Sequence, residues 1–178
     1  MPWLPIALVV LLVVWFLYRR FFLGAGKLEH VLNEISHDRI HGLVLPNADE
    51  GEILIDQLLL TSSGLLVLEI KDIQGTVFGG DKLQEWSAMT QTGRFTFANP
   101  QPGLFDRIAA VRQIVRDVPV EGRLLFPDGA EFAKGIPDHV RSLEALRQEF
   151  GEADKSAARF KIEAFKPHWE QLRKQAVS

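Results

Sequence analysis

A run of apolar residues that ends in two charges, Glu69 and Lys71, is the feature of this sequence with the clearest chemical meaning. Residues two apart in a strand share a face, so these side chains point the same way while Ile70 points to the other side. Asp56 lies in the preceding apolar run and, in a hairpin, can approach Glu69 across the pair. Charges in an apolar sheet are costly unless something compensates them. The sequence therefore predicts that Asp56, Glu69 and Lys71 converge and share a compensating partner.

A divalent metal ion is one such partner. Mg²⁺ (or Mn²⁺) prefers oxygen ligands, and Mg²⁺ typically binds through one or two carboxylates while keeping several waters. On this hypothesis Asp56 and Glu69 hold the ion, and the Ile70 carbonyl adds a ligand. Lys71 then orients or helps to deprotonate a water whose pKa the metal lowers, which is the chemistry of phosphodiester hydrolysis. An alternative stays open, in which Glu69 and Lys71 form a solvated ion pair and Asp56 caps a turn.

The elements that must position these residues follow from apolar periodicity and turn signals. Two apolar runs, residues 53–60 and 65–71, flank a Ser/Gly turn and predict a β-hairpin. Helical spacing predicts helices over residues 27–38, 104–118 and 140–150 and in the C-terminal segment around Pro167, and further strands are expected at residues 76–78, 95–97 and 122–126. This order is an α/β arrangement around a central sheet.

The N-terminal segment is apolar enough to predict a membrane-spanning helix. Residues 3–18 carry no charge and are followed by Arg19 and Arg20. A secretory signal peptide would instead need its positive charges before the apolar run and a small-residue cleavage site after it. We therefore expect residues 1–23 to anchor the protein, with residues 3–23 contacting the lipid bilayer. The positive-inside rule predicts a single-pass protein of the cell membrane whose C-terminal domain is cytoplasmic.

Composition limits the remaining possibilities. The chain has no cysteine, which excludes thiolate metal sites and a thiol nucleophile, and its formal net charge is −3. Acidic residues dominate the body at residues 24–153, whereas an amphipathic helical tail, residues 154–178, is mildly basic. Such a surface does not favour broad phosphate binding, so contact with DNA or RNA must be local or depend on a metal.

An ordered set of short motifs gives this sequence a family resemblance. The motifs are Gly26-Lys27-Leu28-Glu29, Ile55-Asp56, Gly64 through Lys71, Gly75-Thr76-Val77, Trp86 and Phe97-Ala98-Asn99-Pro100. Together, over about residues 24–150, they resemble the nuclease-related domain (NERD) family, which is assigned to the PD-(D/E)xK nuclease superfamily. The resemblance implies a restriction-endonuclease-like α/β fold, with a central mixed sheet flanked by helices. The implied activity is metal-dependent cleavage of DNA or RNA.

The resemblance also implies roles for individual residues. By position, Asp56 and Glu69 correspond to the central acids, Lys71 to the catalytic lysine, and Glu29 to a helix carboxylate near the metal.

Two departures from the family pattern accompany this agreement. Gln57 stands where the family usually has histidine, and Gly103 stands where it tends to have glutamine, with Gln101 displaced by two positions. These departures leave a second hypothesis open: a catalytically degenerate nuclease fold that serves as a membrane-tethered nucleic-acid or protein binding module.

Overall fold

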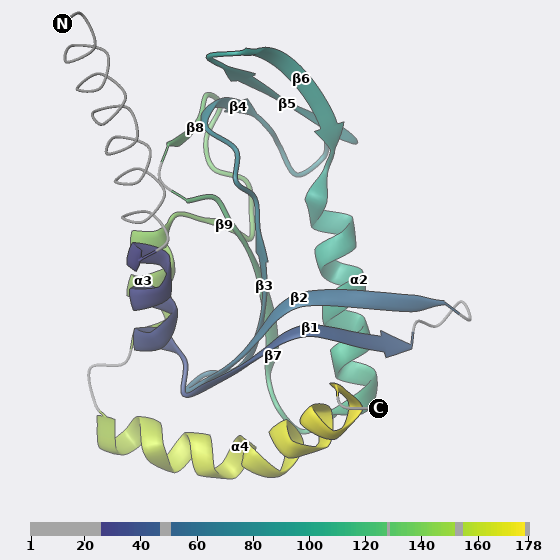
Figure 1. Ribbon diagram of the computed structural model, residues 1–178, viewed down its shortest axis with the longest axis vertical. Coiled ribbons are helices and arrows are strands. Elements are labelled where there is room, and N and C mark those ends of the chain that lie inside the picture. Colours follow the sequence, from purple (N-terminus) through teal and green to yellow (C-terminus); the bar gives the residue numbers. More distant parts are fainter. Residues whose placement is uncertain (1–25, 47–50, 128, 152–154, 177–178) are drawn as a thin grey trace, which may run out of the picture.

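The computed structural model describes residues 26–46, 51–127, 129–151 and 155–176 (Figure 1). A helical segment at residues 26–35 comes first. The elements that follow are β1 (Asp38–Pro46), β2 (Glu52–Thr61), β3 (Gly64–Ile70), β4 (Gly75–Phe78), β5 (Glu85–Thr90), β6 (Gly93–Ala98), α2 (Pro100–Ile114), β7 (Val120–Leu125), β8 (Ala130–Phe132), β9 (Val140–Arg141), α3 (Leu143–Phe150) and α4 (Lys155–Ala176).

The main sheet has the strand order β1-β2-β3-β7-β9 and is mixed, as the sequence predicted. Strands β1, β2 and β3 are antiparallel neighbours, whereas β7 runs parallel to both β3 and β9. The predicted hairpin is confirmed as β2 and β3. Its turn is closed by the Thr61 hydroxyl, which donates to the Gly64 carbonyl at 2.9 Å.

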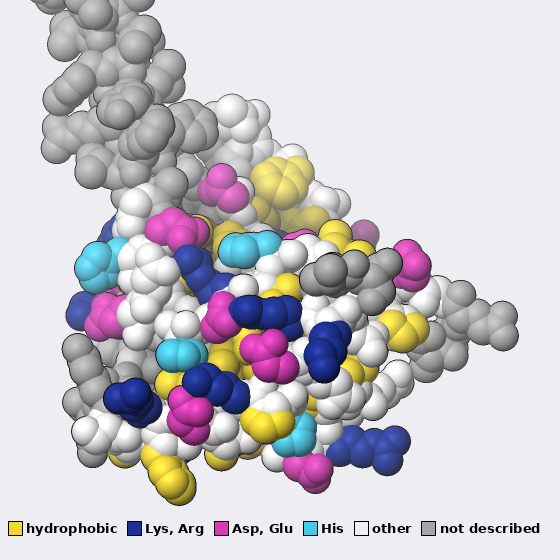
Figure 2. All heavy atoms as spheres, turned by 60° about the horizontal axis from the view of Figure 1, so that its bottom comes forward, with side chains coloured by type: hydrophobic (Ala, Val, Ile, Leu, Met, Phe, Trp, Pro, Cys, Tyr) yellow, Lys and Arg dark blue, Asp and Glu magenta, His cyan; other side chains and the backbone are white. Residues whose placement is uncertain are grey.

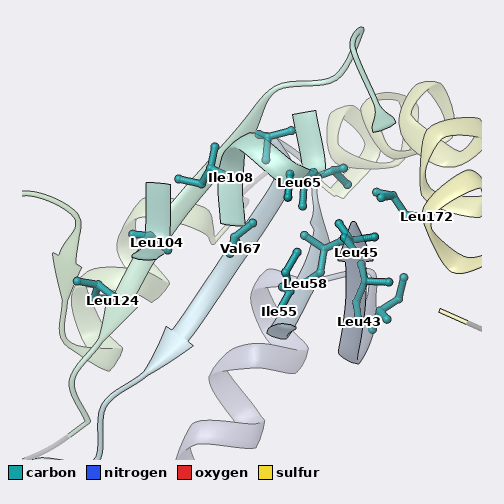
Figure 3. Close-up of a cluster of buried hydrophobic side chains, with 14 of the residues drawn as sticks. Leu43, Leu45, Ile55, Leu58, Leu65, Val67, Leu104, Ile108, Leu124 and Leu172 are labelled. Carbon is teal, nitrogen blue, oxygen red and sulfur yellow. The ribbon is translucent and has the colours of Figure 1, made fainter. Parts of the chain in front are cut away.

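Helices cover both faces of this sheet, which explains why β3 is almost continuously apolar. The segment at residues 26–35 and α3 pack on one face, where Leu32 and Phe150 meet Leu66 and Leu68. Helices α2 and α4 pack on the other face (Figure 1). There Leu104 and Ile108 of α2 and Leu172 of α4 join strand residues such as Leu58, Leu65 and Val67 in a single cluster (Figure 3).

A second sheet, in the order β6-β5-β4-β8, extends the fold beyond the single central sheet expected from the sequence. Its centre is Trp86, which is fully buried and lies 6.1–6.3 Å, between ring centroids, from Phe97, Phe126 and Phe132. The Trp86 indole donates to the Gly80 carbonyl at 3.1 Å, so its one polar atom is satisfied.

The C-terminal helix α4 is part of the folded body. It carries Pro167 inside, as expected, and packs against β1 and β2. Trp169 and Leu172 are buried, and the Trp169 indole donates to Asp38 of β1 at 3.0 Å. Helix α4 thus contributes to the core through Trp169 and Leu172.

The expected membrane anchor, residues 1–23, lies outside the described residues. Within the part that is described, no helix is both long and apolar enough to span a bilayer.

Candidate active site

The predicted site lies at a fork in the main sheet, where β2 and β3 separate. Their pairing ends at Gln57 and Leu68, so Asp56 and Glu69 are the next residues on the two strands. From there β3 continues in one direction while β1 and β2 run together in another (Figure 1). Gly42 of β1, with φ +65°, occupies the register position opposite Asp56, so the ladder on that side is also interrupted there. The structure therefore places both central acids at the same fork.

Glu69 is a buried carboxylate with one satisfied and one unsatisfied oxygen. The residue is 6% exposed, and its Oε1 atom lies 2.5 Å from Lys71 Nζ. The Lys71 backbone N–H donates to the Leu125 carbonyl of β7 at 2.8 Å, which fixes the chain just beyond β3. Glu69 Oε2 is buried and has no hydrogen-bond partner among the described residues. A buried carboxylate oxygen without a hydrogen bond is costly, so this atom is a candidate ligand for a cation.

Arg107 of α2 is the other cation near Glu69. Its Nη1 atom lies 3.6 Å from Glu69 Oε2, which is close enough for an ion pair but beyond a hydrogen bond. Helix α2 is set in place by Asn99, whose side chain accepts from the Gln101 N–H, and by Pro100 in the first turn. From the sequence, Arg107 could contact a nucleic-acid backbone together with Arg112 and Arg116, but a solvated helix face was the favoured interpretation.

Asp56 is exposed on β2 and forms no hydrogen bond or ion pair with any residue that the structure describes. Its carboxylate is therefore available to a ligand from solvent. Ile70, whose carbonyl was predicted as a ligand, is half-buried, and its side chain packs against the cluster on the opposite face of the sheet. This agrees with the alternation expected for Glu69, Ile70 and Lys71.

Glu29 takes part in a different group of contacts. It lies on the helical segment at residues 26–35 and forms an ion pair with Arg39 of β1 at 3.0 Å. Arg39 also donates to Asn33 at 2.8 Å and pairs in register with Leu59, whose side chain belongs to the cluster opposite α2. The structure therefore brings Asp56, Glu69 and Lys71 to one fork but engages Glu29 with Arg39. A role for Glu29 at a metal stays a prediction.

Gln101, the glutamine nearest to the expected family position, is a structural bridge. It is 3% exposed, and its Nε2 atom donates to Asp81 Oδ1 at 2.6 Å and to the Asp138 carbonyl at 2.7 Å. The hydrogen bond from Gln101 is the main reason why the pKa of the Asp81 carboxyl lies below its ordinary value. Gln101 thus fastens α2 to two loops and takes no part in the fork.

The donors at the fork fit a hard divalent cation in type. Among the described residues, no group of three or more His, Asp or Glu side chains is arranged to hold a metal. Mg²⁺ does not need such a group, because it is commonly held by one or two carboxylates with water in the other positions. The buried Glu69 oxygen without a hydrogen bond and the exposed Asp56 carboxylate are ligands of the type that such an ion takes.

The face of the molecule that Figure 2 shows has mixed charge. Lys and Arg side chains alternate there with Asp and Glu, without an extended basic area. A cavity of about 690 Å³ lies between α2 and β7, and its lining includes Arg112, Arg116 and His139. At the fork, Lys71 and Arg107 supply positive charge beside Glu69.

Comparison with known proteins gives one match. The model of the family described as the nuclease-related domain matches residues 22–127. The match includes Asp56, Glu69, Lys71 and Arg107, and it ends before the position near residue 150 that the sequence motifs suggested. No curated protein and no solved structure matches the chain.

Proposed function

The chain belongs to the nuclease-related domain family, and from that premise we propose that it is a membrane-anchored, metal-dependent nuclease that hydrolyses phosphodiester bonds of DNA or RNA. One observation carries the proposal. At the fork between β2 and β3, a buried glutamate has one oxygen bound to Lys71 and the other without a hydrogen-bond partner among the described residues. A purely structural ion pair gives no reason to leave that second oxygen buried and unsatisfied.

The proposed roles follow from the contacts at the fork. Asp56, Glu69 and the Ile70 carbonyl would hold Mg²⁺ (or Mn²⁺), which when bound supplies a Lewis acid and lowers the pKa of a coordinated water. Glu69 fixes the Lys71 ammonium at the end of β3, because the two side chains are in direct contact. Lys71 can there offset the negative charge of a phosphate and orient a water by donating a hydrogen bond to it. Asp56 is exposed, so it would be the metal ligand that is open to solvent and substrate.

The binding-module hypothesis also has an observation in its favour. Lys71 and Arg107 already compensate the charge of Glu69 without a metal, and Gln101 is committed to Asp81 and Asp138. A fold that had lost catalysis could retain these contacts and still bind nucleic acid or protein.

Nuclease assays distinguish the two functions. The full-length chain would be incubated with labelled single- and double-stranded DNA and RNA, with Mg²⁺ or Mn²⁺ or with EDTA. We expect metal-dependent cleavage that falls about 100-fold or more in Asp56→Ala and Lys71→Ala variants. Glu52→Gln is the matched control, since Glu52 is an exposed carboxylate on the same strand as Asp56. Full activity in EDTA, or equal activity in all four proteins, would refute the catalytic assignment. A folded chain that binds but cuts nothing would favour the binding module.

The membrane anchor requires its own experiment. Its support is the uncharged run at residues 3–18 and the two arginines that follow it. We expect the full chain to float with lipid vesicles and to resist extraction at alkaline pH, whereas a variant lacking residues 2–23 should remain in the aqueous fraction. Equal partitioning of the two proteins would contradict the anchor and leave the nuclease proposal intact.

A further inference from the structure

We propose that Arg107 is a further catalytic residue, which binds the scissile phosphate beside the Glu69–Lys71 pair. This inference rests on the proposed function, because it assigns a role within the same fork. Arg107 comes from α2, 38 residues after Glu69 in the sequence, and only the fold brings its guanidinium to 3.6 Å from the Glu69 carboxylate.

The guanidinium of Arg107 is held in a fixed orientation. Its Nε atom donates to the Leu54 carbonyl of β2 at 2.8 Å, and its Nη1 atom donates to the Gly103 carbonyl at 2.9 Å. Its Nη2 atom has no hydrogen-bond partner among the described residues, and the side chain is 24% exposed. A guanidinium that is already oriented loses little conformational freedom on binding, and its planar donors match phosphate oxygens. Arg107 is therefore preorganised to receive an anion from solvent.

Glu69 forms an ion pair with Arg107 but no hydrogen bond to it, so the guanidinium can still bind another anion. Lys71 Nζ is 2.5 Å from one Glu69 oxygen, whereas Arg107 is 3.6 Å from the other and forms no hydrogen bond to it. Two cations, Lys71 and Arg107, thus adjoin the buried Glu69 carboxylate. A phosphate at the fork would complete the donor set of Arg107.

Gly103 leaves open space beside the guanidinium of Arg107. A Cβ atom at residue 103 would lie 2.9 Å from Arg107 Nη1, closer than such contacts normally allow. Residue 103 is also the position at which the motif pattern departs from glutamine. Because residue 103 is glycine rather than glutamine, no side chain from this residue occupies the space next to the Arg107 guanidinium.

The test uses the full-length chain and four variants: Arg107→Ala, Arg107→Lys, Gly103→Ala and the control Arg112→Ala. Arg112 lies on the same helix and donates to a backbone carbonyl, that of Val120, at 2.6 Å, but it is not in contact with Glu69. The control therefore removes the same kind of arginine-to-backbone contact away from the fork. Labelled DNA and RNA oligonucleotides are the probes, with Ca²⁺ for binding by fluorescence anisotropy and Mg²⁺ for cleavage.

We expect Arg107→Ala to lower kcat about 100- to 1,000-fold. It should also reduce the slope of log affinity against log salt by about one phosphate contact. Arg107→Lys should recover part of both losses, because it retains the charge but not the planar donors. Gly103→Ala should weaken binding and cleavage without lowering the unfolding temperature, because alanine favours the helix while its methyl group displaces the guanidinium. If Arg107 had only a structural role, a variant that lost activity would also show a lower unfolding temperature.

Each contrary result has a distinct meaning. If the wild type cleaves and Arg107→Ala retains kcat and the salt slope, the role of Arg107 is refuted and the nuclease proposal stands. If the wild type binds without cleaving, the nuclease proposal fails, and the salt slope alone then supports or overturns phosphate binding by Arg107. If the wild type binds none of the probes, both proposals are overturned.

Discussion

Replacing Trp169 by alanine should release the C-terminal helix α4 from the main sheet. Trp169 is 1% exposed and its indole donates to Asp38 of β1 at 3.0 Å, while Leu172, one turn further, is fully buried beside it. Trp169 and Leu172 lie outside the family match at residues 22–127, yet their side chains pack on the face of the sheet that also carries α2. The prediction therefore tests whether the folded domain needs residues beyond the matched range.

The expected cost follows from what the substitution removes. Truncation of a buried tryptophan to alanine costs about 3–5 kcal/mol, which includes the cavity left behind. The total free energy of unfolding of a domain is only about 5–15 kcal/mol, so this single change would remove a large part of it. Trp169→Phe retains most of the ring but loses the hydrogen bond to a carboxylate, for an expected cost of about 1.5–3 kcal/mol. Asp38 keeps its ion pair with Arg173 in that variant.

Urea unfolding followed by circular dichroism measures both changes. Phe160→Ala is the matched control, because Phe160 is an aromatic residue on the same helix that is 81% exposed, and it should change stability by no more than about 0.5 kcal/mol. A cost below about 1 kcal/mol for Trp169→Ala, or the same cost for both alanine variants, would refute the packing of α4 described above. A chain ending near residue 153 should show at least the loss seen for Trp169→Ala.

Two further predictions concern the main sheet. Gly64→Ala should destabilise the fold by at least about 1–3 kcal/mol, because Gly64 has φ +132° and an added Cβ would lie 2.3 Å from the Pro119 carbonyl oxygen. Thermal unfolding measures this loss, and an unchanged unfolding midpoint would contradict the prediction. Burial raises the pKa of Glu149, but hydrogen bonds from Arg123 and Arg141 outweigh it and hold the pKa below the ordinary value of 4.5. A lowered folded-state pKa stabilises the protein above pH 4.5, and this stabilisation is lost as the pH falls through the folded-state value. The Glu149→Gln variant should therefore be less stable than the wild type at pH 7, and urea titrations should show that it loses less stability between pH 6 and pH 3. Parallel stability profiles for the two proteins would show that the ion pairs of Glu149 with Arg123 and Arg141 contribute nothing to stability.

Several elements of the fold could be predicted from the sequence, because their signals are local. The apolar runs on either side of the Ser/Gly turn predicted the hairpin of β2 and β3, and helical spacing over residues 104–118 predicted most of α2, which the structure shows to begin at Pro100. Strand β1 was not predicted, since Gly42 interrupts its apolar pattern and its stability comes from pairing with β2. Val140 was assigned to a helix but pairs with Leu124 as β9, because two residues carry no periodicity of their own.

The second sheet illustrates the same limit. The sequence predicted strands at residues 76–78 and 95–97, which correspond to β4 and β6, but it did not separate them from the central sheet. The separation arises because Trp86, Phe97 and Phe132 pack into an aromatic cluster that brings distant segments together. Such contacts depend on shape, which residue types alone do not specify.

The sequence by itself determined the chemistry available at the site. Alternation along one strand placed Glu69 and Lys71 on the same face, and the hairpin put Asp56 and Glu69 just beyond its last pair, because strand periodicity and turn signals are set by near neighbours in the chain. Only the tertiary structure decided that the second Glu69 oxygen has no hydrogen bond among the described residues, that Glu29 pairs with Arg39, and that Arg107 stands at the fork. These outcomes depend on how α2 and the helical segment at residues 26–35 pack on opposite faces of the sheet. Packing of that kind is governed by burial and shape over the whole fold rather than by spacing along the chain.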